Sequence, residues 1–153
     1  MKVKEAAVSY KTNPLKRAER QSARVIPVYR WSNFEKIDAI KDGISKEELE
    51  NLKEQAELDY DIIAKILNVT KATLHNKKGK AKFDAYISEK IFLLADLYSY
   101  GFEVFESNER FNQWMKHENR ALGNVTPLSL LDTLYGMEEV KHLIGRIEYG
   151  VYS

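Results

Sequence analysis

The feature that most constrains this fold is a series of helix start signals, each followed by apolar residues at helical spacing. Residues 45–48 read Ser-Lys-Glu-Glu, a capping box in which the Ser45 hydroxyl accepts from the Glu48 amide and the Glu48 carboxylate reaches back. No stretch alternates apolar and polar residues as a half-buried strand does. The predicted fold class is therefore all-α. Further helix starts are expected at Asp59 or Asp61, Thr70, Ser88, Asn108, Thr126 and Gly136.

Charge divides the chain into a basic amino-terminal stretch and an acidic remainder. The chain of 153 residues has a net charge of +1, whereas residues 1–30 hold eight basic and two acidic side chains, a net charge of +6. Pro14 and Pro27 interrupt this stretch, and no sustained helical period appears before Phe34. We expect residues 1–33 to form a basic arm that need not be rigid. Such arms bind nucleic acid or another polyanion, and the alternative is a solvated tail without a partner.

Composition excludes several classes of protein. The chain has no cysteine, so it forms no disulfide, thiol nucleophile or thiolate zinc site, which fits a reducing cytoplasm. Its longest apolar run covers residues 91–95, far short of the ~20 residues that span a bilayer. We expect a cytoplasmic protein with no membrane partner.

Signals for catalysis are missing as well. The histidines His75, His117 and His142 are scattered, with no carboxylate at metal-ligand spacing, and no glycine-rich phosphate loop or nucleophile elbow occurs. The acidic pair Glu47 and Glu48 is explained by helix capping. We expect no catalytic residue, no metal and no cofactor, and hence no enzyme.

Residues 60–79 have the pattern of a helix-turn-helix unit. Such a unit needs a small residue midway along its first helix, a turn residue that tolerates positive φ, and apolar residues where the helices face each other. Ala64 is the small residue and Asn68 the turn residue. Lys77 departs from the pattern, because an apolar residue is common at that position. The apolar positions are Ile63, Leu67, Val69 and Leu74.

The same frame predicts a DNA-binding face. With Leu74 pointing inward, the second helix offers its other side chains to the major groove, and the lysines that follow lie near phosphates. Residues 58–82 hold six lysines and two aspartates, a net charge of +4. The alternative is a helical hairpin whose lysines are only solvated. The predicted DNA-binding residues are Thr70, Lys71, Ala72, Thr73, His75, Asn76, Lys77, Lys78 and Lys80, with Lys71 the first choice for a base contact.

The carboxy-terminal part carries a denser motif. It contains Trp114, then Asn119-Arg120-Ala121-Leu122-Gly123, then Pro127-Leu128 with Leu130-Leu131-Asp132-Thr133, and it ends Arg146-Ile147-Glu148-Tyr149-Gly150-Val151-Tyr152-Ser153. This motif resembles the toxin-binding domain of the Xre/ParS/MbcA antitoxins. The resemblance is specific over residues 108–153, and residues 34–100 match the family's helix-turn-helix part loosely.

The resemblance implies a function. It implies an antitoxin of a type II toxin–antitoxin pair that inhibits a RES-type toxin, which consumes NAD, or a related ADP-ribosyltransferase, and that represses its own operon. It further implies a homodimer within a larger complex, with a DNA-binding and dimerisation domain at residues 34–100 and a toxin-binding domain at residues 101–153. The residues it assigns to the toxin's NAD pocket are Arg146, Glu148, Tyr149, Gly150, Val151, Tyr152 and Ser153.

Two other functions remain open from the residues themselves. One is a stand-alone helix-turn-helix transcriptional regulator that acts without a toxin. The other is an antitoxin whose helix-turn-helix no longer binds DNA, which Asn68 and Lys77 slightly favour.

Overall fold

The computed structural model describes residues 28–150, and its elements are all helices, so the predicted all-α class is confirmed. Residues 1–27 of the predicted arm and residues 151–153 lie outside the described residues. Between Val28 and Gly150 no helix is both long and apolar enough to cross a membrane. In chain order the elements are the 3-10 helix η1 (Val28–Arg30), α3 (Asn33–Asp42), α4 (Lys46–Gln55), α5 (Tyr60–Leu67), α6 (Lys71–Asn76), α7 (Ala85–Phe105), α8 (Asn108–Lys116), the 3-10 helices η2 (Arg120–Leu122) and η3 (Pro127–Leu130), and α9 (Leu134–Glu148).

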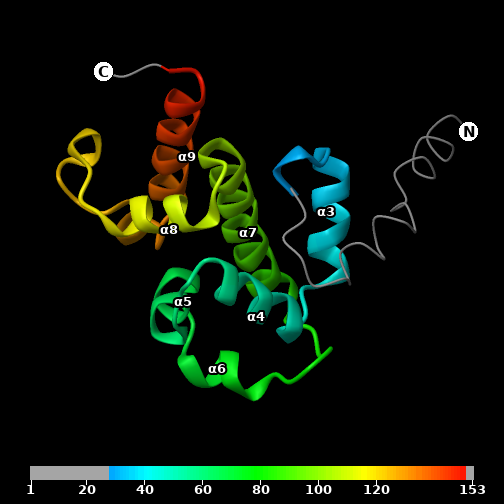
Figure 1. Cartoon of the computed structure of the whole chain (residues 1–153). Coiled ribbons are helices and arrows are strands. Elements are labelled where there is room, and N and C mark those ends of the chain that lie inside the picture. Colours follow the sequence, from blue (N-terminus) through cyan, green and yellow to red (C-terminus); the bar gives the residue numbers. More distant parts are fainter. Residues whose placement is uncertain (1–27, 151–153) are drawn as a thin grey trace, which may run out of the picture.

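The long helix α7 is the element on which the others pack (Figure 1). Helix α3 and η1 lie on one side of it, α8 and α9 on the other, and α4 to α6 gather at its amino-terminal end. Leu94 and Tyr98 of α7 are almost fully buried within one continuous apolar core. The helix-turn-helix part and the carboxy-terminal part therefore share a core instead of forming two separate ones.

Several predicted helix starts are confirmed. The Ser45 capping box is present, Asp59 accepts from the Ile62 amide at 2.8 Å, and Thr70 accepts from the Thr73 amide at 3.2 Å. These caps satisfy amides that a helix leaves without an internal partner.

The predicted start at Ser88 is wrong. Helix α7 begins at Ala85, where Asp84 accepts from the Ile87 amide at 2.9 Å. The Ser88 hydroxyl is buried, accepts from the Ile44 amide at 2.9 Å and donates to the Phe83 carbonyl. The Ser88 hydroxyl could accept a hydrogen bond from an amide at the start of its own helix, but it accepts from the distant Ile44 amide instead.

Helix α8 begins at Asn108 as predicted, with Ser107 as its cap. Helix α9 begins at Leu134, two residues before the predicted start at Gly136, and Thr133 caps it by accepting from the Gly136 amide at 3.0 Å. Gly136 lies within the first turn of α9, and a side chain at this position would overlap the Leu130 carbonyl. Its role is close packing and not helix initiation.

The final residues of the expected arm pack against α7. The Trp31 side chain is 9% exposed, and the Tyr29 amide donates to the Ser99 hydroxyl at 3.2 Å. Ser32 and Glu35 then form a capping box for α3. An ordered structure therefore begins before Phe34, where the helical pattern was expected to start.

Asp96 joins three helices by charge. Its carboxylate lies in α7 and is 9% exposed, and it binds the ammonium of Lys36 from α3 at 2.8 Å and that of Lys141 from α9 at 2.9 Å. The Lys36 ammonium also donates to the Tyr29 carbonyl at 3.3 Å. Because both carboxylate oxygens have a cationic partner, the carboxylate is compensated despite its burial.

We expect Asp96→Asn to lower the free energy of unfolding by about 1–3 kcal/mol, because it removes the charge that binds both ammonium groups. Urea denaturation checks this. The exposed carboxylate of Asp132 supplies the control, since Asp132→Asn should change stability by less than about 0.5 kcal/mol. Equal stability of the two variants would contradict a structural role for the Asp96 charge.

Gly101 lies in α7, and the Phe111 ring of α8 rests on it. A side chain at this position would overlap that ring. Phe111 is fully buried and makes edge-on contacts with Tyr98 and Phe102 at centroid distances of 5.3 and 5.7 Å. The close approach of α8 to α7 therefore requires glycine here.

Gly101→Ala should destabilise the protein by about 1–3 kcal/mol, since the new methyl group forces the Phe111 ring out of a packed core. Thermal denaturation is the measurement. The control is Gly145→Ala in α9, where a methyl group would meet the Tyr100 hydroxyl at an ordinary 3.4 Å. Replacing a helical glycine by alanine otherwise stabilises by up to about 1 kcal/mol. A rise in the melting temperature of Gly101→Ala would be inconsistent with this packing.

Candidate functional site

Helices α5 and α6 form the predicted helix-turn-helix frame. Asn68 ends α5 in the left-handed region at φ 53°, and its amide donates to the Lys65 carbonyl at 3.2 Å. The small residue Ala64 is 7% exposed, whereas Leu67 and Leu74 are fully buried. The apolar sides of the two helices therefore face each other and the core, as the sequence pattern predicted.

Most of the side chains predicted to bind DNA lie on the outer side of this frame. Leu74 is the buried residue of α6, and Thr73 and Lys77 are half-buried. The exposed members of the predicted set are Thr70, Lys71, Ala72, His75, Asn76, Lys78 and Lys80.

Some of these side chains already have partners within the chain. The Lys71 ammonium lies 3.1 Å from the Asp61 carboxylate, and the His75 ring lies 4.5 Å from the Tyr60 ring. The Thr70 hydroxyl caps α6 and lies 2.8 Å from the Thr73 hydroxyl. Thr70 and Thr73 thus stabilise the start of α6. Lys71 would have to break its ion pair with Asp61 before it could contact DNA.

A buried lysine behind α6 was not anticipated from the sequence. Lys46 in α4 is 4% exposed, and its ammonium donates to the Leu74 carbonyl at 2.6 Å. It also lies 4.3 Å from the centre of the Tyr60 ring and 3.8 Å from Glu50. Burial lowers the pKa of Lys46, and the Glu50 carboxylate opposes that shift. Burial and the hydrogen bond to Glu50 raise the pKa of Tyr60 to about 12.

The loop after α6 is bound to the start of α4. The Glu47 amide donates to the Gly79 carbonyl and the Lys46 amide to the Ala81 carbonyl, both at 3.0 Å. Ser45 and Lys82 form an isolated antiparallel bridge next to these bonds. The lysines of the loop are therefore presented by backbone that is fixed to a neighbouring helix.

The predicted carboxy-terminal site lies at the end of α9. Glu148 is the last residue of α9 and accepts from the Tyr100 hydroxyl at 2.5 Å. Burial and that hydrogen bond raise the pKa of Tyr100. Arg146 is half-buried, whereas Tyr149 is 79% exposed and Gly150 is exposed. Val151, Tyr152 and Ser153 lie outside the described residues.

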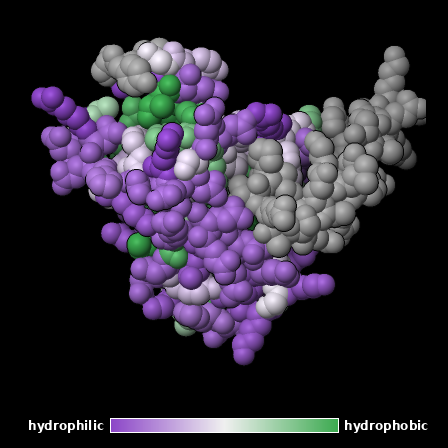
Figure 2. Space-filling model, viewed as in Figure 1, coloured by the Kyte–Doolittle hydropathy of each residue, from purple (hydrophilic) through white to green (hydrophobic). Residues whose placement is uncertain are grey.

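The surface differs between the two ends of the molecule. In Figure 2 the helix-turn-helix end is mostly hydrophilic, and hydrophobic residues gather near the carboxy-terminal end of α9. An exposed apolar patch of this kind marks an interaction surface more often than scattered apolar residues do.

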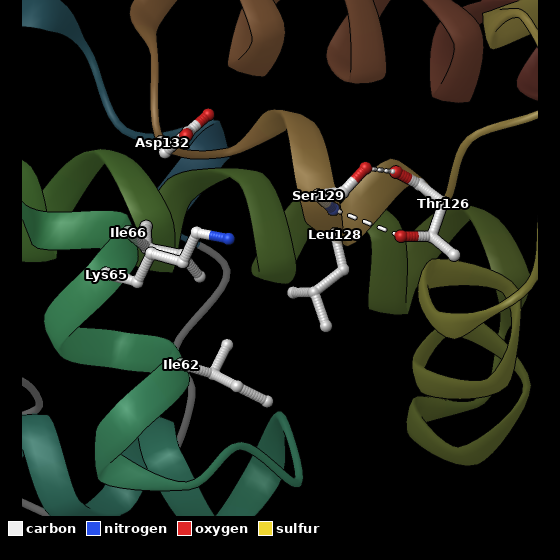
Figure 3. Close-up of a pocket in the computed structure, with 7 residues that line it drawn as sticks. All are labelled: Ile62, Lys65, Ile66, Thr126, Leu128, Ser129 and Asp132. Atoms are coloured by element: carbon white, nitrogen blue, oxygen red, sulfur yellow. Dashed lines mark hydrogen bonds between the residues drawn. The ribbon is translucent and has the colours of Figure 1, made fainter.

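A groove of about 190 Å³ separates the two parts of the chain where α5 meets η3 (Figure 3). Ser129 is held to Thr126 by bonds from its amide and its hydroxyl, at 3.2 and 2.7 Å. The groove is lined by Ile62, Lys65, Ile66, Thr126, Leu128, Ser129 and Asp132.

Within residues 28–150 no group of histidines and acidic residues has the arrangement of a metal site.

Two family models match these two parts of the chain. Residues 35–96 match the antitoxin Xre-like helix-turn-helix domain, and residues 101–150 match the antitoxin Xre/MbcA/ParS C-terminal toxin-binding domain. The chain belongs to the Xre/MbcA/ParS antitoxin family. The first matched segment ends and the second begins within α7, the helix shared by both parts of this antitoxin.

Curated relatives of the antitoxin agree with the family. An Antitoxin Xre of Photorhabdus laumondii is 42% identical over 76 residues, which are 49% of this chain and 51% of that protein, so the match spans about half of that relative. An Antitoxin Xre of Yersinia enterocolitica is 28% identical over 119 residues, 76% of this chain and 80% of that protein. A Prs ADP-ribosylating antitoxin of Sphingobium is 26% identical over 136 residues, 82% of this chain and 86% of that protein.

Proposed function

We propose that this antitoxin inhibits a RES-type toxin by occluding the toxin's NAD pocket with its carboxy-terminal segment, and that it represses its own operon through α5 and α6. The observation that carries the toxin half is the match of residues 101–150 to a toxin-binding domain. The proposed toxin-binding residues are Arg146, Glu148, Tyr149, Gly150, Val151, Tyr152 and Ser153.

Two features at the end of α9 support this mode of inhibition. Tyr149 is 79% exposed directly after the helix ends, so its ring is available to a partner. Hydrophobic surface gathers close by (Figure 2), and apolar and aromatic groups dominate the binding energy at protein interfaces. The antitoxin would act by occupying space and burying surface, without catalysis, metal or cofactor of its own.

The chemistry of the toxin has a second candidate within the same proposal. The name of the Sphingobium relative refers to ADP-ribosylation of Prs, which favours an ADP-ribosyltransferase as the partner. Both toxins would use NAD, so the same pocket argument applies. The first measurement is therefore cellular NAD after expression of the neighbouring reading frame alone, and then together with this antitoxin. A harmless neighbour would leave the stand-alone regulator as the better explanation.

Ending the chain after Glu148 should abolish neutralisation of the toxin while leaving the fold intact, because α9 ends at that residue. The measurements are growth and cellular NAD during co-expression with the toxin. Thermal denaturation of the shortened chain controls for folding, and its melting temperature should stay within about 4 °C of the full chain. Full protection by the folded, shortened chain would rule out occlusion by this segment.

The DNA half of the proposal rests on the helix-turn-helix frame and its exposed cations. The lysines of α6 and the following loop lie on its outer side, where a recognition helix meets the major groove and its flanking phosphates. A homodimer would present two such frames to two half-sites of an operator. Asn68 adopts the positive φ that the turn requires, so this residue no longer favours an antitoxin without DNA binding.

Lys78→Ala should weaken binding to the duplex upstream of the antitoxin gene, because it removes an exposed cation near the phosphates. The slope of log affinity against log salt should become shallower by about 0.9 for one lost phosphate contact. Lys71→Ala should have a smaller effect, since Lys71 gives up Asp61 to bind DNA. Fluorescence anisotropy at several salt concentrations is the measurement.

The matched control is Lys41→Ala, an exposed lysine near the end of α3, which should leave both affinity and slope unchanged. Neutralisation of the toxin should be retained in all three variants. If the affinity for the duplex does not change with salt concentration, or if the protein does not bind the duplex, the antitoxin acts by toxin binding alone.

A further inference from the structure

Lys46 contacts both ends of the segment that carries Lys77, Lys78 and Lys80, which we call the basic loop. The segment runs from Leu74, the buried residue of α6, to Ala81. The Lys46 ammonium donates to the Leu74 carbonyl at 2.6 Å, and the Lys46 backbone amide donates to the Ala81 carbonyl at 3.0 Å. Lys77, Lys78 and Lys80 all lie between these two bonds.

Near Gly79 the segment is fixed by a backbone bond alone, from the Glu47 amide to the Gly79 carbonyl at 3.0 Å. That glycine adopts φ +58°, and a side chain added to it would have no heavy atom within 4 Å, so no side-chain packing holds the segment there. Beyond the end of α6 the backbone at Lys77 is already extended, with φ −76° and ψ 143°. The Leu74 carbonyl is thus the last point at which the segment is anchored in the core before the lysines begin.

The Lys46 ammonium is bound within the protein, where it stabilises the structure and does not contact a ligand. The side chain is buried, so the group lies within the protein and has no access to a phosphate. The Tyr60 ring lies 4.3 Å away and Glu50 3.8 Å away, and the Tyr60 hydroxyl donates to Glu50 at 3.1 Å. Hydrogen bonds from a charged donor are the strong ones in proteins, which suits an anchor for a helix end.

We propose that Lys46 is a positioning residue for DNA binding, which anchors the carboxy-terminal end of α6 so that Lys77, Lys78 and Lys80 are held where phosphates lie. This inference rests on the proposed DNA-binding function. It predicts that loss of the Lys46 ammonium weakens DNA binding, although Lys46 itself does not contact DNA.

The test compares Lys46→Met with Lys53→Met in the full chain. Methionine keeps the length and the apolar stem of lysine and removes the charged donor. Lys53 is the matched control, because it lies in the same helix and 5.1 Å from the same Tyr60 ring, but its side chain does not hold α6. Both variants lose one positive charge behind the helix-turn-helix frame, so any purely long-range effect of charge is shared.

With the duplex upstream of the antitoxin gene as the probe, Lys46→Met should lose about tenfold in affinity, the scale of one hydrogen bond to a charged group. Lys53→Met should stay within about twofold. The salt slope of Lys46→Met should equal that of the unchanged chain, whereas a phosphate-contacting lysine would lower it by about 0.9. Unchanged affinity, or a slope that falls by this amount, overturns the proposal.

Amide hydrogen exchange separates this proposal from the proposed function. If the unchanged chain does not bind the duplex, DNA binding fails, but faster exchange at residues 71–82 in Lys46→Met than in Lys53→Met still supports the anchor. Equal exchange in the two variants overturns it. If Lys46→Met does not fold, Lys46→Arg replaces it, because arginine keeps the charge and a donor. Exchange at residues 71–82 should then match the unchanged chain, and faster exchange counts against the proposal.

Discussion

The whole arrangement depends on α7, and on the buried Asp96 carboxylate that binds α3 and α9 to it. The poorly solvated carboxylate is compensated by two ammonium partners, one on each oxygen. Lys36 comes from the helix-turn-helix part and Lys141 from the carboxy-terminal part, so the charge fixes how the two parts meet. A short carboxy-terminal domain that buries little surface alone thereby gains the core of its neighbour.

The helix class and several caps could be predicted because their causes are local. A serine followed three residues later by glutamate, or an asparagine that tolerates positive φ, acts on its own backbone, and Ser45 and Asn68 behave accordingly. The predictions for Ser88 and Gly136 were wrong because a group outside the helix of each residue decides its role. Ser88 binds an amide 44 residues earlier in the chain, and Gly136 makes room for the Leu130 carbonyl.

The candidate site shows the same division between local and distant causes. The outward side of α6 followed from helical spacing once Leu74 was assigned to the core, and the exposure of Lys71 and Lys78 agrees with that spacing. Lys46 could not be found in this way. It stands at the first position of an amphipathic helix, where a lysine is normally solvated, and the carbonyl that it binds is 28 residues away. The Leu74 carbonyl of α6 and the Tyr60 ring of α5 lie against its ammonium, so tertiary packing makes it a buried cation.

The two proposed interfaces lie far apart on the molecule, and this has a consequence for function. Figure 1 places α6 at one end and the end of α9 at the other, with α7 between them. A toxin that covers the end of α9 would therefore leave the outer side of α6 open to DNA. Because both parts pack on α7, the relation between the two surfaces is fixed by buried contacts and not by a linker.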